Sequence, residues 1–143
     1  MAAFDYYISL EDLDSLIKSD QLEVITRSNP TNLTKAIVFA QSEIEGYINS
    51  RYDVATLFAA RGNERHPHLC MIMCDIAIYH AYSNISSIKI PPIRMDRYDA
   101  AIEFLKKVAS GTISPNFPPK EYEDTSNSGA FNFGGARKRD TRY

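Results

Sequence analysis

The chain has 143 residues, 44% of them hydrophobic, which is enough apolar material for one ordinary domain with its own core. Its formal net charge of −2 gives no general argument for binding to nucleic acid or to an acidic membrane. The opening MAAFDYYISLEDLDS carries acids and no basic residue, which does not fit a secretory signal, and no apolar run is long enough to span a bilayer. We therefore interpret the chain as a soluble protein.

The first predicted element is a short amphipathic helix that ends near Asp20. Ser9 followed by Asp12 resembles a capping box, with Asp in place of the usual Glu. A short apolar link at residues 22–25 and a loop at residues 28–31 then lead into the next helix.

The most strongly periodic stretch is a predicted helix over residues 32–54, NLTKAIVFAQSEIEGYINSRYDV. Either Asn32 or Thr31 can cap its start by accepting a backbone hydrogen bond. At about 100° per residue the apolar positions gather on one face of this helix. They are Leu33, Ala36, Ile37, Ala40, Ile44, Tyr47 and Ile48.

Arg51 falls near the middle of that apolar face. Because a guanidinium cannot lose its charge, it must find acceptors there, either helix-end carbonyls or a carboxylate on a neighbouring helix. We predict that Arg51 is a buried structural residue. Val38 and Phe39 lie outside the apolar face and indicate a second contact surface, formed with another helix or another subunit.

Residues 53–67 are expected to form a connecting loop, with Pro67 at the first position of the following helix. In Leu69–Tyr82 apolar residues cover nearly the whole circumference, a pattern typical of a fully buried helix. Asp75 is the only acid of this segment, which makes it the first candidate partner for Arg51.

The last predicted helix is amphipathic and covers Arg94–Ser110, with Gly111 as its stop signal. The predicted fold is therefore a small all-α bundle of about four helices, spanning residues 1–113.

Residues 114–143 form a predicted extended and partly disordered arm, because this segment is too polar to order itself. Its basic end can touch phosphates, remain a solvated end, or fold against a partner and tie subunits together. The candidate interface residues of the arm are Tyr122, Phe131, Phe133, Arg137, Lys138, Arg139, Arg142 and Tyr143.

His66, His68, Cys70 and Cys74 are the one group of residues with zinc-ligand chemistry, although their spacing matches no common zinc site. Buried cysteines are common without any metal, so we predict core cysteines, no metal site and a reducing compartment. His80 is read as a hydrogen-bonded core histidine. Paired acids such as Glu43 and Glu45 are read as a solvated face, and no catalytic arrangement is predicted.

Several segments together resemble a known family. The run AIVFAQSEIEGYINSRYDV resembles the signature of small Mu-like phage structural proteins, roughly A-x-x-x-A-x-x-E-I-x-x-Y-L-x-x-R-Y-x-x-P. The resemblance covers about residues 6–113. The matching signature positions are Ala36, Ala40, Glu43, Ile44, Tyr47, Arg51 and Tyr52, and further similar segments are Tyr7–Leu13, Cys74–Tyr79 and Arg97–Gly111.

These proteins resemble the head–tail connectors, or adaptors, of tailed phages. The resemblance implies a ring of identical subunits, expected to be a dodecamer, below the portal protein and in contact with the tail or the next neck ring. Genomic DNA would pass through without sequence-specific contacts. It implies location in the virion neck, and in the host cytoplasm during assembly, with no enzyme activity, no cofactor and no membrane partner. Tyr47, Arg51, Tyr52 and Asp75 are then structural residues.

Two other classes remain as alternatives. A small helical DNA-binding or regulatory protein would show tight, salt-sensitive binding to short duplex DNA. A small metal-dependent enzyme would be purified with a catalytic metal.

Overall fold

The computed structural model describes residues 5–27, 31–85 and 89–121. These residues form six α-helices and no β-strand, apart from an isolated antiparallel bridge between Tyr52 and Pro119. The all-α fold class predicted from the sequence is confirmed, with six helices in place of about four. None of the helices formed by these residues is both long and apolar enough to cross a membrane.

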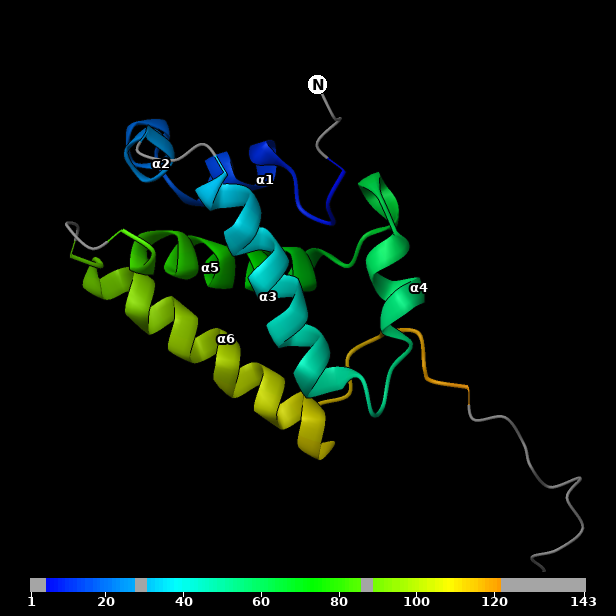
Figure 1. The fold of residues 1–143 in the computed structure, drawn as a ribbon. Coiled ribbons are helices and arrows are strands. Elements are labelled where there is room, and N and C mark those ends of the chain that lie inside the picture. Colours follow the sequence, from blue (N-terminus) through cyan, green and yellow to red (C-terminus); the bar gives the residue numbers. More distant parts are fainter. Residues whose placement is uncertain (1–4, 28–30, 86–88, 122–143) are drawn as a thin grey trace, which may run out of the picture.

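The central element is α5, Pro67–Ser83, which corresponds to the predicted buried helix. Its apolar residues cover the whole circumference, so every side of it must be covered by another element. Figure 1 shows α5 between α6, Pro92–Ser110, and the first two helices, with α3, Asn32–Ile48, crossing it. Direct contacts of α5 with α1, α3 and α6 enclose it.

The N-terminal region differs from the sequence prediction. It forms two helices, α1 over Leu10–Leu16 and α2 over Ser19–Arg27, so the predicted apolar link at residues 22–25 is wrong. Buried Leu13 and Ile25 anchor the two helices to the core. The predicted capping box is confirmed, because Asp12 N donates to the Ser9 side chain and Ser9 N donates to the Asp12 carboxylate.

The long predicted helix ends earlier than expected. α3 stops at Ile48, because Asn49 and Ser50 are weaker helix formers and the amides of Arg51 and Tyr52 both bond back to the Ile48 carbonyl. The predicted loop over residues 53–67 instead contains α4, Val54–Ala59, and a 3-10 helix, Gly62–Glu64. The Asp53 side chain caps α4 by accepting from Thr56 N, a helix-start signal that the sequence prediction missed.

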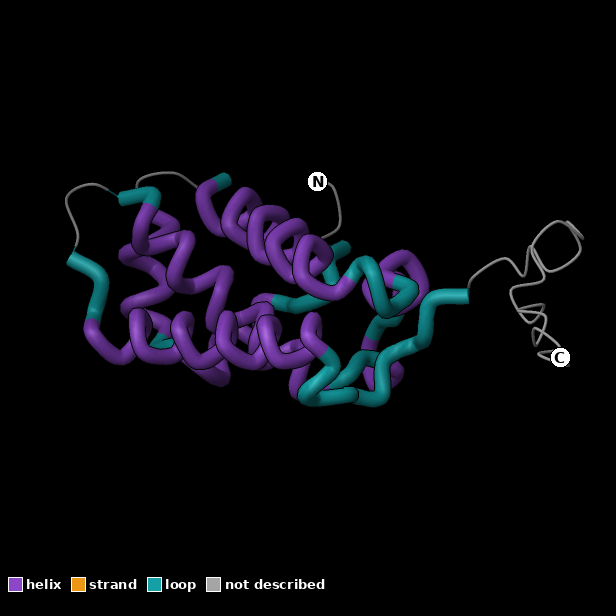
Figure 2. Tube along the Cα trace, turned by 90° about the horizontal axis from the view of Figure 1, so that it is seen from below, coloured by secondary structure: helices purple, strands orange, loops and turns teal. Residues whose placement is uncertain are grey.

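The end of α6 confirms the predicted stop at Gly111, which adopts a left-handed φ of 82°. After it, residues 112–121 form a strap that returns to the start of α4, where Asp53 N donates to the Pro118 carbonyl. The strap buries Phe117 in the core, so the packed unit extends beyond the predicted boundary at residue 113. The strap is among the teal segments gathered at one end of the helices in Figure 2.

Asn32 joins three helices rather than capping α3. Its buried side-chain amide donates to the carbonyls of Ile25 on α2 and Ala81 on α5, both at 3.0 Å, and its oxygen accepts from Asn84 Nδ2. Thr31, the residue at the cap position, makes no side-chain cap hydrogen bond. The amide therefore satisfies two helix-end carbonyls that would otherwise be buried without a donor.

We predict that Asn32→Ala lowers the free energy of unfolding by about 2–3 kcal/mol, because it leaves buried carbonyls without a donor. Urea unfolding measures this change. Lys35→Ala, on the exposed side of the same helix, is the control and should shift stability by less than about 0.5 kcal/mol. Equal effects of the two substitutions would contradict the prediction.

Candidate functional site

Arg51 and Gly111, which are far apart in the sequence, meet at the carboxyl end of α6. The Arg51 guanidinium occupies the space that a Cβ atom at Gly111 would need. Arg51 itself is exposed, so its predicted burial is wrong. A cation at this place is favoured by the negative end of the helix dipole.

Asp75 is buried as predicted, but its partner is Arg97 on α6 and not Arg51. Arg97 Nε donates to Asp75 Oδ1 at 2.7 Å and Nη2 donates to Oδ2 at 3.3 Å. This hydrogen bonding raises the pKa of Arg97. The prediction failed because it continued the helical rotation past Ile48, where α3 ends.

The other two predicted structural residues lie on and just after α3. Tyr52 is buried, and the edge of its ring meets Phe117 of the strap at a centroid distance of 5.4 Å. Tyr47 is half-buried and packs against the core. Tyr52 thus connects the end of α3 to the strap, next to its backbone bridge with Pro119.

Glu43 joins α3 to both α5 and α6, which corrects its interpretation as part of a solvated face. One carboxylate oxygen lies 2.7 Å from His80 Nε2, and the other accepts from the Tyr98 hydroxyl at 2.7 Å. The Tyr98 ring stacks on Tyr79 at a centroid distance of 4.0 Å. Burial and the hydrogen bond to Glu43 raise the pKa of Tyr98, so its hydroxyl stays a donor. His80 is hydrogen-bonded as predicted, but it is half-buried and not a core residue.

A second polar network fastens the N-terminal segment to the start of α5. Arg65 bonds to the Asp12 carboxylate and to the Tyr7 carbonyl, while the Tyr7 hydroxyl accepts from His66 N at 2.8 Å. Burial raises the pKa of Tyr7 to about 12. Burial also acts to raise the pKa of Asp12, but the hydrogen bonds from Arg65 and Ser9 outweigh it, and the pKa is lowered overall.

The four residues with zinc-ligand chemistry point to different neighbours. His66 caps α5 by accepting from Leu69 N and meets Phe117, whereas His68 lies against Phe104 of α6. Burial raises the pKa of both thiols, which disfavours the thiolates that zinc binds. Cys74 is a core residue as predicted, and Cys70 is half-buried. Within the described ranges, no three His, Cys, Asp or Glu residues are grouped to hold a metal ion.

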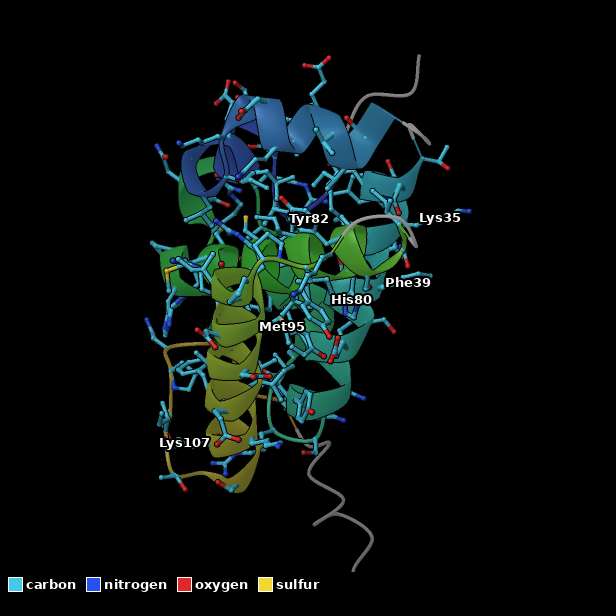
Figure 3. The ribbon with its side chains drawn as sticks, turned by 90° about the vertical axis from the view of Figure 1, so that its left-hand side faces the viewer. Lys35, Phe39, His80, Tyr82, Met95 and Lys107 are labelled. Atoms are coloured by element: carbon cyan, nitrogen blue, oxygen red, sulfur yellow. The ribbon has the colours of Figure 1, made fainter. Side chains whose placement is uncertain are left out.

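Several large apolar side chains remain exposed. Phe39 on α3 is 52% exposed and its neighbour Val38 is 47% exposed, as expected for residues outside the core face. Figure 3 shows Phe39 to one side of His80 and Met95 of α6 to the other. The other exposed apolar residues are Leu10, Val24, Met71 and Ile93.

The predicted interface residues of the arm lie outside the described residues. They are Tyr122, Phe131, Phe133, Arg137, Lys138, Arg139, Arg142 and Tyr143.

Fold and site together define a small all-α protein in which charged and aromatic side chains connect helices to one another. The family model described as Bacteriophage Mu, Gp36 matches residues 7–133, and the chain belongs to this family. It is thus a Mu-like phage protein, and the match continues past residue 113 to include Phe131 and Phe133. Among curated proteins, none matches the chain.

We predict that Gly111→Ala destabilises the protein for two reasons. A left-handed φ costs an L-residue about 1–2 kcal/mol, and the added Cβ displaces the Arg51 guanidinium. Thermal and urea unfolding should therefore show a loss greater than the backbone cost alone.

Gly62→Ala is a matched control, because Gly62 also has a positive φ, of 61°, but open space around its Cβ position. The additional loss at Gly111 should shrink in an Arg51→Ala background, where the clash is relieved. Equal losses for the two glycine substitutions would show that the guanidinium is not held against Gly111.

We also predict an acid-dependent loss of stability at Asp12. Because the folded-state pKa lies below 3.8, the usual value for an aspartate, the carboxylate stabilises the fold at pH values above 3.8. This contribution is lost as the pH falls through the lower folded-state pKa. Asp12→Asn should therefore cost about 1–3 kcal/mol at pH 7, and this difference from the unsubstituted protein should shrink towards pH 2.

Urea unfolding at both pH values measures the effect, with Asp14→Asn as a control on the exposed side of the same helix. A difference for Asp12→Asn that is the same at both pH values would refute the assignment.

Proposed function

We propose that the chain is a structural virion protein, a head–tail connector subunit that forms a ring below the portal protein. The ring extends the DNA channel and joins the tail, and the subunit performs no catalysis. Membership of the Mu Gp36 family carries this proposal, because it places the chain among phage proteins. The head–tail role itself comes from the resemblance of its segments to connector proteins.

Surface composition supports an assembling subunit. Exposed apolar side chains lie on α1, α2, α3, α5 and α6, whereas the polar clusters at Glu43, Asp75 and Asp12 connect helices within the subunit. Apolar exposure on several faces suits a ring. Each subunit of a ring contacts its two neighbours through two different surfaces, and it makes further contacts with the proteins above and below.

Charge is compatible with a DNA channel. A formal net charge of −2 gives little attraction to the phosphate backbone, so DNA can pass without being held. A DNA-binding regulator would need a concentrated basic surface.

The proposed ring is tested by purifying the full chain alone and together with the portal protein of the same phage. Native mass spectrometry and negative-stain electron microscopy should show rings of identical subunits, attached to the portal when it is present. A chain that stays monomeric in both mixtures, yet binds short duplex DNA in a salt-dependent manner, would overturn the proposal in favour of a DNA-binding protein.

We predict further that truncation after Glu121 leaves the domain intact, because it preserves the Asp53–Pro118 and Arg51–Lys120 backbone hydrogen bonds of the strap. Helicity by circular dichroism should match that of the full chain. Heads built with the truncated chain should fail to accept tails, because the truncation removes residues 122–143, the part of the arm that is expected to hold the joint. Infectious particles containing only the truncated chain would show that the arm has no such role.

A further inference from the structure

An open groove runs between α1 and the first turns of α5, with a volume of about 450 Å³. Leu16, Cys70 and Met71 give it apolar walls, and Met71 is 41% exposed. Asp12 and Arg65 also line the groove, but they are bonded to each other. Its open surface therefore suits an apolar side chain better than a polar small molecule.

The N-terminal segment that forms one side of this groove carries more acids than bases, even though Asp5 pairs with Arg61 and Asp12 with Arg65. Residues 5–27, which include α1 and α2, contain six acids and two basic residues. α1 itself, LEDLDSL, carries three acids and no basic residue. A segment that places apolar groups in the groove and basic groups beside it would match both its shape and its charge.

The end of this chain has that composition. Residues 131–143, FNFGGARKRDTRY, begin with two phenylalanines and continue with four basic residues against one acid. Aromatic side chains are typical interface anchors, and basic residues a few positions later would face the acids of α1. We propose that the groove between α1 and α5 is the docking site for residues 131–143 of a neighbouring copy of the chain.

The place where the strap ends favours a neighbouring copy over the same chain. The strap passes His66 at the start of α5 but ends just beyond α3, where Lys120 N donates to the Arg51 carbonyl and Lys120 Nζ to the Asn49 carbonyl, whereas the groove lies against α1 (Figure 1). A head-to-tail contact between identical subunits joins two different surfaces, here the end of the strap and the groove. The 22 residues after Glu121 can extend over about 70 Å, enough to cross to the next subunit.

The inference rests on the proposed assembly of copies, and it names the surface that receives the arm. Each arm adds a weak and salt-sensitive contact, because part of it is electrostatic. In a closed assembly these contacts act together, so the combined attachment is firmer than any single one.

Cysteine cross-linking tests the proposal, because Cys70 lies in the groove and Cys74 is buried. The donor chain carries Asn132→Cys with Cys70→Ser, and the acceptor is the unaltered chain with an affinity tag that changes its mass. Asn132 lies between the two phenylalanines, so both aromatic anchors are kept. Mild oxidation of the mixture should give a donor–acceptor heterodimer linked at Cys70, and less of it at high salt.

Two matched controls make the result specific. Ser126→Cys in place of Asn132→Cys moves the thiol to another part of the same arm and should cross-link poorly. Met71→Lys in the acceptor should abolish the product, whereas Met95→Lys, at a site on α6 of similar exposure, should leave it unchanged.

No heterodimer, or equal yields with both arm positions and both lysine variants, would overturn the proposal. A third chain carries Asn132→Cys and keeps Cys70. If its two thiols cross-link within one chain, while the donor–acceptor mixture gives no heterodimer, the assignment to a neighbouring copy is overturned. Native mass spectrometry of the same mixture distinguishes a failure of the proposed docking site from a failure of the proposed ring. Rings without cross-links refute only the docking site, and cross-linked pairs without rings refute only the ring.

Discussion

The rest of the structure depends on the need to enclose α5. A helix that is apolar on all sides is stable only when other elements cover every side, and α1, α3 and α6 do so here. Its few polar groups must then be paired inside the protein. Asp75 is paired by Arg97 and His80 by Glu43, so the same contacts that satisfy these groups also fix α6 and α3 in place.

Residues that carry the family resemblance meet at such contacts. Arg51 of the α3 signature lies against Gly111, at the end of the last matching segment, and Glu43 of the same signature bonds to Tyr98. Tyr7 and Asp12 of the opening segment join the start of α5 through Arg65 and the His66 amide. The signature therefore describes how this fold is held together. For the proposed connector, the assembly contacts would then come from surfaces outside this framework, such as Phe39, the α1–α5 groove and the arm.

Charge is distributed unevenly along the chain, although its formal net charge is only −2. The acids of residues 5–27 and the basic residues of 131–143 nearly cancel in the total, so overall composition gives no sign of either. A contact between the two segments of different copies would bring opposite charges together and set the direction of assembly.

The sequence by itself determined the all-α class, the buried central helix, the capping box at Ser9 and the end of α6 at Gly111. These features follow from local periodicity and from backbone chemistry within a few residues. Only the tertiary structure decided that Asp75 pairs with Arg97, that Glu43 is half-buried and that Asn32 joins three helices. In each case the partner comes from a segment distant in sequence. Arg51 shows the physical reason: a shift of the helix end by a few residues rotates a side chain away from the core, and periodicity does not show where a helix ends.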